Sequence, residues 1–272
     1  MKQYQGLTVT VVGSSHLRAQ KPCQDKSAAF GNYDFSAIVV CDGHGGEKHF
    51  RSEKGAEIAV STAQKVVPAF VKSVGKHPPP SVSSHQWREL EKRMVFDWRE
   101  TVEKDYAKHR FSHQELAAFS SDMQNELNAD PYIAYGTTLL LAVMCAKHLF
   151  LLQLGDGDCV LFRAGTEEKP IKDDPRCAFG RTASLCDRDA LAHIRDCIFA
   201  DKHISGCVLS TDGVKNSFEN EEYYLKFCQT LLSECRTNKK AKAELQQFLP
   251  QLSKNGSGDD VSIAVLFRRI RE

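Results

Sequence analysis

The sequence predicts an α+β protein in which paired β-strands are interrupted by groups of helices. Two observations support this prediction. Short apolar runs bounded by glycine turns occur in both halves of the chain, and such runs are typical of buried strands. Between them lie segments in which apolar residues recur every three or four positions, the spacing of a helix with one buried face. With 272 residues and 42% hydrophobic content, the chain can bury a substantial core within a single domain.

In the first half of the chain, apolar and β-branched runs predict three strands, and helical spacing predicts three helices. The strands are expected at 7–12, 27–30 and 35–41, and the helices at 47–74, 87–106 and 112–127. Pro68 lies within the first helix, where it is expected to break or kink it. Ser112 followed by Glu115 matches a capping box, which marks the start of the third helix. Residues 76–84 are a linker too short to separate two domains.

The second half is predicted to contain most of the remaining β-structure. Strands are expected at 139–145, 149–154, 159–163, 207–210 and 261–267. The first two of these form a buried hairpin. Helices are expected near 188–199 and at 221–235 and 240–252.

Composition excludes several classes of partner. The net charge is +1, with 36 Lys and Arg residues against 35 Asp and Glu residues, and no segment is basic enough for a nucleic-acid face. No apolar stretch approaches membrane-spanning length, and residues 1–20 lack the apolar core of a signal peptide. None of the ten cysteines has the short spacing of a zinc site. We therefore expect a soluble, cytoplasmic protein with reduced cysteines that binds neither nucleic acid nor membrane.

The central candidate for a functional site is the turn that follows the apolar run at 35–41. This run leads directly into Asp42-Gly43-His44-Gly45-Gly46. The glycines allow backbone to approach a ligand closely, and the turn places Asp42 and His44 at the mouth of a sheet. Taken alone, the motif is equally consistent with a glycine-rich turn that carries a solvated aspartate.

Aspartates recur where apolar strands meet glycine turns. The set comprises Asp42, Asp156, Asp212 and Asp259, with Asp25 just before a further strand. Carboxylates gathered at one edge of a sheet repel each other unless a cation neutralises them. Oxygen ligands suit hard cations such as Mg²⁺ or Mn²⁺, and two such ions about 4 Å apart can activate water for attack on phosphorus. Spacing alone does not establish that the aspartates converge.

Six short motifs, taken together, resemble those of the metal-dependent Ser/Thr protein phosphatases of the phosphatase 2C family. They are Gln24-Asp25, Asp42-Gly43-His44-Gly45-Gly46, Gly136-Thr137-Thr138, Gly155-Asp156, Ser210-Thr211-Asp212-Gly213 and Asp259-Asp260-Val261-Ser262. The motifs follow the family's order and span nearly the whole chain. The resemblance implies a bacterial-type catalytic domain over residues 1–272. It also implies a four-layer αββα sandwich, in which two antiparallel sheets are flanked by helices.

The resemblance further implies a metal site that holds two Mn²⁺ or Mg²⁺ ions. In that site Asp42 bridges both ions, the carbonyl of Gly43 binds one of them, and Asp212 and Asp259 complete the first ion's ligands. Asp25 stands near the ions and holds coordinated water. Asp156 matches the position associated with a third, weaker metal site.

His44 takes the role of general acid toward the leaving alkoxide in this resemblance; the alternative is a histidine that stabilises the turn. Many family members place a phosphate-binding arginine where this chain has Gln20. Arg18, Lys21 or His16 is a candidate replacement. After the ligand motifs, Asp158 stands in place of the commoner arginine and Asp260 in place of the usual asparagine, which adds charge near the metals. Residues 164–205 are expected to hold the flap that shapes substrate access.

Three classes of function remain open. The first is a phosphoserine and phosphothreonine protein phosphatase, which acts in signalling on a phosphorylated protein, with a cognate Ser/Thr kinase as its counterpart. The second is a pseudophosphatase that binds phosphoproteins without turnover, suggested by Gln20. The third is a metal-dependent phosphohydrolase that acts on small phosphate esters. The presence of candidate metal ligands and a candidate acid favours the first class.

Overall fold

The computed structural model describes residues 4–75, 84–172, 174, 177, 182–200 and 202–270. Over these residues the strands form two antiparallel five-stranded sheets. One sheet has the order β1 (Tyr4–Val11), β10 (Val261–Arg268), β9 (Ile204–Ser210), β6 (Asp158–Arg163) and β7 (Thr166–Glu168). The other has the order β2 (Lys26–Gly31), β3 (Phe35–Cys41), β4 (Leu139–Cys145), β5 (His148–Leu154) and β8 (Arg195–Ala200).

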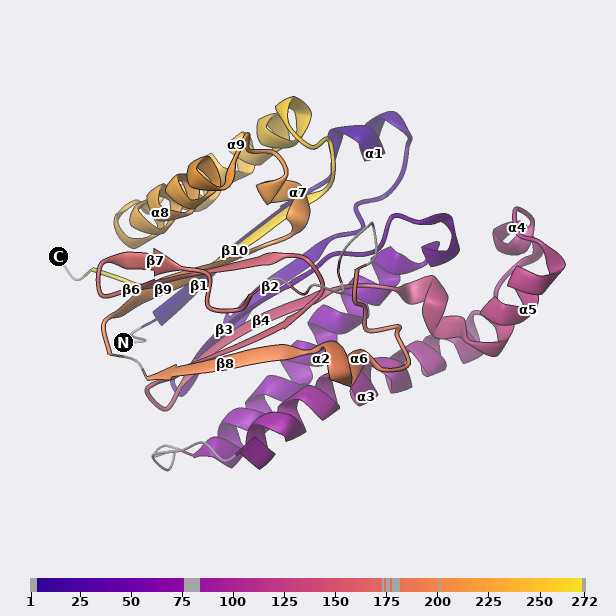
Figure 1. Cartoon of the computed structure of the whole chain (residues 1–272), viewed down its shortest axis with the longest axis horizontal. Coiled ribbons are helices and arrows are strands. Elements are labelled where there is room, and N and C mark those ends of the chain that lie inside the picture. Colours follow the sequence, from indigo (N-terminus) through magenta and orange to yellow (C-terminus); the bar gives the residue numbers. More distant parts are fainter. Residues whose placement is uncertain are drawn as a thin grey trace.

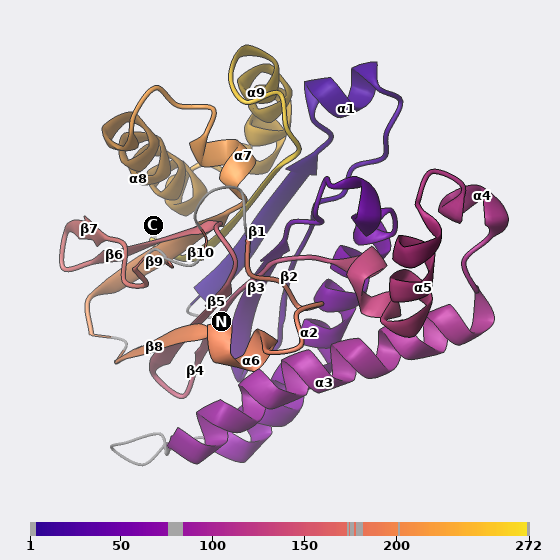
Figure 2. The same cartoon turned by 45° about the vertical axis from the view of Figure 1, so that its right-hand side comes forward.

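Long helices cover the outer face of each sheet (Figure 1). The helices α2 (Ser52–Val74) and α3 (Ser84–Lys108) lie against the sheet that contains β3. The helices α8 (Glu221–Thr237) and α9 (Ala241–Asn255) lie against the sheet that contains β10. The view in Figure 2 shows the same order of helices, sheet, sheet and helices. The predicted α+β class and four-layer sandwich are confirmed.

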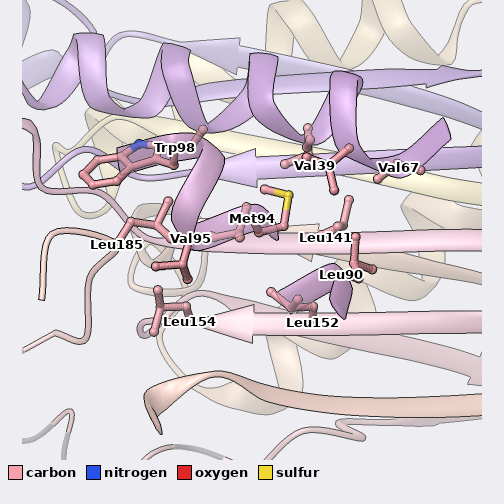
Figure 3. Packing of buried hydrophobic residues seen from close by; sticks show 14 of the residues in the cluster. Val39, Val67, Leu90, Met94, Val95, Trp98, Leu141, Leu152, Leu154 and Leu185 are labelled. Atoms are coloured by element: carbon pink, nitrogen blue, oxygen red, sulfur yellow. The ribbon is translucent and has the colours of Figure 1, made fainter. Parts of the chain in front are cut away.

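Buried apolar side chains fill each of the three spaces between the layers. Strand β3 is apolar except at Ser36, and its side chains face two layers. Val39 packs toward the helices α2 and α3, whereas Ile38 and Val40 pack toward the other sheet. Figure 3 shows Met94 of α3 in the same cluster as Val39 and Leu141 of the sheet. Each side chain of this size contributes about 1.5–3 kcal/mol when it is fully buried. A strand buried on both faces is therefore mainly apolar, and its polar Ser36 donates to the carbonyl of Tyr4 at 2.8 Å.

The predicted strands are confirmed to within a few residues, and most helices follow the predicted spacing. The first predicted helix is divided, because residues Glu47–His49 form a short 3₁₀ helix before α2 begins. Pro68 does not break α2, which continues to Val74. Gln64, whose carbonyl loses its hydrogen-bond donor at Pro68, and Pro68 itself lie on the exposed face of α2. Water can therefore satisfy that carbonyl.

The region after Ser112 forms two helices where one was predicted. The capping box of Ser112 and Glu115 is present and begins the short helix α4 (His113–Leu116). A second cap then begins α5 (Ser121–Ala129), where the hydroxyl of Ser120 accepts from the backbone N–H of Met123. The second cap was not recognised because serine is also common in turns.

The helix predicted near 188–199 is wrong. Only α6 (Ala190–His193) is helical, and the residues that follow form β8. Here Ile198 pairs with Phe150 of β5. The segment is extended because it pairs with the edge of this sheet. The irregular stretch predicted after β1 contains the short helix α1 (Ser14–Arg18). Residues 76–83 of the predicted linker, and residues 173, 175–176, 178–181 and 201 of the predicted flap, lie outside the described residues.

All ten cysteines are free. Within the described ranges, no helix has the length and apolar character needed to span a membrane.

Candidate active site

The candidate aspartates occupy strand ends that neighbour one another. Asp25 precedes β2 and Asp42 follows β3, and these strands pair at Lys26 and Cys41. Asp212 begins the short helix α7 (Asp212–Lys215) directly after β9, while Asp259 precedes β10, the neighbour of β9. The backbone N–H of Thr211 donates to the carbonyl of Ser262 across these two strands at 3.0 Å. Strand pairing therefore brings distant parts of the sequence to one end of the sandwich.

The charges that act on Asp42 come from the other candidate aspartates. Burial raises the pKa of Asp42 well above its ordinary value, and neighbouring charges raise it further. Those charges belong to Asp25, Asp212, Asp156 and Asp259. The aspartates that the sequence singled out thus act on one another across a single site. Such a group carries unneutralised negative charge when no cation is bound.

Asp212 and Asp25 are held differently within this group. Burial and the charge of Asp156 raise the pKa of Asp212 to about 6, and a side-chain hydrogen bond with Asp42 partly offsets the rise. Asp25 is only 1% exposed, and its carboxylate accepts from the hydroxyl of Thr211 at 2.9 Å. Burial, followed by the charge of Asp260, raises the pKa of Asp25 well above its ordinary value.

The donor set fits Mg²⁺ or Mn²⁺, since it consists of carboxylate oxygens and backbone carbonyls. Among the described residues, no three such side chains already surround one point as a closed metal cage does. Ions of this type keep several water ligands, so they do not need an all-protein cage. Asp42, Asp212 and Asp259, with the carbonyl of Gly43, are the groups available to hold the ions.

Backbone contacts fix the turn that carries Asp42. The backbone N–H of Thr138 donates to the carbonyl of Asp42 at 2.8 Å, and the N–H of Asp42 donates to the hydroxyl of Thr138 at 3.0 Å. The N–H of His44 donates to the carbonyl of Gly136 at 3.0 Å. At Gly43 a Cβ would lie 2.7 Å from the carbonyl oxygen of Gln24, so only glycine fits. The Gly136-Thr137-Thr138 motif thus holds the acidic turn in place.

His44 is neutral in this environment. Burial, together with the nearby His49 and Lys48, lowers the pKa of His44 to about 3. Its Nε2 atom is buried and has no hydrogen-bond partner in the described part of the chain. The ring of His49 lies 4.9 Å from that of His44 in an edge-on arrangement, and His49 Nδ1 donates to the carbonyl of Ile133 at 2.5 Å. Sequence reasoning missed His49, because its spacing from His44 matches no expected motif.

The turn after β5 places Asp156 at the exposed rim of the site. The hydroxyl of Thr182 donates to Asp156 Oδ2 at 2.6 Å, and Arg195 donates to the carbonyl of Gly155 at 2.6 Å. The next acidic residue, Asp158, is buried between two lysines, with Lys169 Nζ at 2.5 Å and Lys215 Nζ at 3.2 Å. Asp158 therefore joins β6 to the end of α7 and is not free to bind a ligand.

The three candidates for phosphate binding lie in or directly after α1. His16 is turned toward acidic side chains, with Nδ1 3.0 Å from Asp260 Oδ2 and Nε2 4.0 Å from Asp259 Oδ1. It is therefore not free to bind phosphate. Arg18 and Lys21 are exposed, and the intervening Gln20 has a positive φ of 55°. The chain turns sharply at the position where the resembled family carries its arginine.

We expect the affinity for Mn²⁺ to fall as the pH drops below about 6, because protonated Asp212 cannot serve as a ligand. The metal-free protein should show the opposite trend in stability. The folded-state pKa of Asp212 lies above its ordinary value of 3.8, so stability present at low pH is lost as the pH rises through about 6. Bound Mn²⁺ should restore it.

Thermal unfolding at pH 5 and pH 7.5, with and without Mn²⁺, measures both effects. The rise in Tm caused by Mn²⁺ should be clearly larger at pH 7.5. Equal rises at the two pH values would contradict this assignment of Asp212 as a ligand that competes with protons.

The four-layer fold places the candidate carboxylates and His44 at neighbouring strand ends. The chain belongs to the protein phosphatase 2C family, whose family model matches residues 12–250. The predicted family and enzyme class are therefore confirmed. No curated protein matches the sequence.

Solved structures with the same fold include several bacterial phosphatases. One described as a bacterial serine phosphatase has a TM-score of 0.61 and 16% identity, covering 98% of both chains. Serine/threonine phosphatase Stp1 from Staphylococcus aureus has a TM-score of 0.59 and 17% identity, covering 98% of this chain and 95% of Stp1. The catalytic domain of PstP, in complex with two manganese ions, has a TM-score of 0.56 and 14% identity, covering 98% and 99%. At these identities the likeness shows the fold alone.

Proposed function

We propose that this protein is a metal-dependent phosphatase that hydrolyses phosphoserine and phosphothreonine in proteins. The observation that carries the proposal is the placement of Asp25, Asp42, Asp212 and Asp259 at the neighbouring ends of β2, β3, β9 and β10. Membership of the protein phosphatase 2C family supports it, and so does the fold shared with PstP, whose structure holds two manganese ions. A bound cation stabilises such a cluster, because it neutralises the repulsion between the carboxylates.

Each residue of the site has a role in this proposal. Asp42 would hold both ions, and Gly43, Asp212 and Asp259 would complete their protein ligands; Asp156 would serve a third, weaker site. Bound Mn²⁺ or Mg²⁺ supplies the acidity that makes water a nucleophile at neutral pH. Asp25, fixed by the hydroxyl of Thr211, is placed to accept a hydrogen bond from water near the ions.

His44 is the proposed general acid. The imidazole of His44 is neutral in the free protein, and a nearby anion would raise its pKa because negative charge favours the protonated form. Substrate phosphate would supply that charge. His44 would then donate to the alkoxide oxygen as the phosphorus–oxygen bond breaks. The unpartnered Nε2 atom of His44 is available for this donation.

The test of the proposed function is turnover of phosphoserine and phosphothreonine peptides with Mn²⁺, with Mg²⁺ and with excess EDTA. Activity should require the metal and stop with the chelator. Thiol reagents should not abolish turnover by modifying a nucleophile, since the proposed site contains no cysteine. Full activity in EDTA would overturn the proposal. Binding of phosphopeptide without turnover would favour the pseudophosphatase, and turnover confined to small phosphate esters would favour the third class.

Substitution of Arg18 tests how the phosphate is bound. We expect Arg18→Ala to raise KM for phosphopeptide about ten- to a hundredfold, because a charge-assisted contact contributes roughly 1.5–3 kcal/mol. Inhibition by inorganic phosphate should weaken and Mn²⁺ affinity should stay unchanged. If Arg18→Ala behaves like the parent, Lys21→Ala is the next variant, since Lys21 is also exposed. If neither matters, the metals alone hold the phosphate, and Gln20→Arg should lower KM.

The setting of this activity is also proposed. All ten cysteines are free, which supports a reducing compartment, and we place the protein in the cytoplasm. Its partner would be a phosphorylated protein supplied by a Ser/Thr kinase. The near-neutral net charge of +1 favours no nucleic-acid partner.

A further inference from the structure

Asp260 is buried directly beside the proposed ligand Asp259 and forms an unusual set of contacts. Only 3% of its surface is exposed. Its Oδ1 atom accepts from the backbone N–H of Gly13, and its Oδ2 atom accepts from the backbone N–H of Gln24, both at 2.6 Å. The imidazole of His16 lies on the same side, with Nδ1 3.0 Å from Oδ2. Asp260 thus joins both ends of the segment that carries α1 to the start of β10.

These contacts require a carboxylate. Each of the two carboxylate oxygens of Asp260 accepts a hydrogen bond from a backbone N–H. Both side-chain positions must therefore be acceptors, and neither can be a donor. Asparagine places an NH₂ group at one of the two positions, whichever way its amide is turned. That group would then face Gly13 or Gln24, donor against donor, in a buried site. The geometry explains why this chain has aspartate where the resembled family usually has asparagine.

The segments that Asp260 joins are packed backbone against backbone. A Cβ at Gly13 would lie 2.3 Å from the carbonyl carbon of Asp259, and one at Gly213 would lie 2.2 Å from the carbonyl oxygen of Asp260. The N–H of Ser15 donates to the carbonyl of Gly258 at 2.8 Å. A shift at Asp260 would therefore be transmitted to the segment before Asp25 and to the segment that begins with Asp212.

Asp259 itself is linked to the same arrangement. Its Oδ1 atom accepts from the backbone N–H of Asp260 at 2.8 Å and lies 4.0 Å from His16 Nε2. His16 therefore faces both acidic residues from one side. The orientation of the Asp259 carboxylate depends on where Asp260 and His16 hold it.

We propose that Asp260 is a positioning residue that sets the affinity of the metal site by fixing Asp25, Asp212 and Asp259 relative to one another. His16 acts as its third contact rather than as a phosphate ligand. The proposal rests on the proposed metal-dependent function. Residues that orient metal ligands typically change metal affinity 10- to 100-fold when they are replaced.

The test compares Asp260→Asn with the unaltered protein by calorimetric titration of Mn²⁺ and by hydrogen exchange of the metal-free protein. We expect Asp260→Asn to weaken Mn²⁺ binding about 10- to 100-fold. The amides of residues 13–24 should exchange faster. His16→Gln, which leaves both backbone contacts of Asp260 in place, should weaken Mn²⁺ binding less and keep the protein folded. Asp122→Asn, at an exposed position of α5, is the matched control and should match the unaltered protein in both measurements.

The outcomes separate positioning from mere stability. If Asp260→Asn lowers only the Tm of the metal-free protein and binds Mn²⁺ like the parent, the positioning role is overturned. If Asp260→Asn does not fold, unchanged Mn²⁺ affinity in His16→Gln overturns the role of His16. If the unaltered protein binds no Mn²⁺, the proposed function fails. If the amides of residues 13–24 exchange at the same rate in Asp260→Asn as in the unaltered protein, the positioning role of Asp260 is overturned. This measurement needs no metal.

Discussion

Asp42→Asn is expected to lower phosphatase activity by at least roughly 10³-fold, since a metal ligand supplies several kcal/mol of transition-state stabilisation. The substitution removes the charge on which the other carboxylates converge. Affinity for Mn²⁺ should fall with activity, and Asp212→Asn should behave in the same way. In the absence of metal, the same substitution should instead stabilise the folded protein. Asparagine at position 42 removes a repelled charge, so the metal-free Tm should rise.

Steady-state turnover, Mn²⁺ titration and thermal unfolding measure these three effects on one set of proteins. Asp122→Asn is again the control for loss of a carboxylate at an exposed position. Full activity in Asp42→Asn would remove Asp42 from the metal site. A fall in the metal-free Tm would show instead that Asp42 stabilises the fold by a contact.

His44→Gln should slow hydrolysis of phosphoserine peptide roughly 10²-fold while Mn²⁺ still binds, because the variant loses a proton donor and no metal ligand. The loss should be smaller for an aryl phosphate, whose phenolate leaves without protonation. His44 is neutral before substrate binds, with a pKa lowered to about 3 by burial and by the nearby His49 and Lys48. The protonated form is therefore needed only in the complex with phosphate.

Comparing the two substrates for His44→Gln and for His113→Gln isolates this role. His113 is exposed at the start of α4 and serves as the control for loss of an imidazole. Equal losses on both substrates for His44→Gln would exclude general-acid catalysis. His44 would then be a residue that stabilises the turn against Gly136 and His49.

The sequence predicted the central strands well, because their burial on both faces leaves a nearly continuous apolar run. Residues Phe35–Cys41 of β3 match their predicted range, since Ser36 is the only polar residue among them. Edge strands lack this signal. In β8, Arg195 and Asp196 give a mixed pattern, and only pairing with β5 makes the segment extended. The wrong prediction of a helix there follows from that difference.

The site was predictable where chemistry follows directly from the residue type. Each candidate aspartate stands next to a strand, and the resemblance implied that they share one metal site. The role of Asp260 was not predictable, because its partners Gly13 and Gln24 lie more than two hundred positions away in the sequence. The same holds for His16, which looked available for phosphate until its contacts with Asp260 and Asp259 were known.

The central claim is that the carboxylates around Asp42 hold a pair of metal ions. Crystals of the protein grown with Mn²⁺ and measured at the manganese absorption edge test it most directly. We predict two anomalous peaks about 4 Å apart, both in contact with Asp42, with Asp212 and Asp259 on one of them. No anomalous peak at Asp42 in crystals that contain Mn²⁺ would contradict the account.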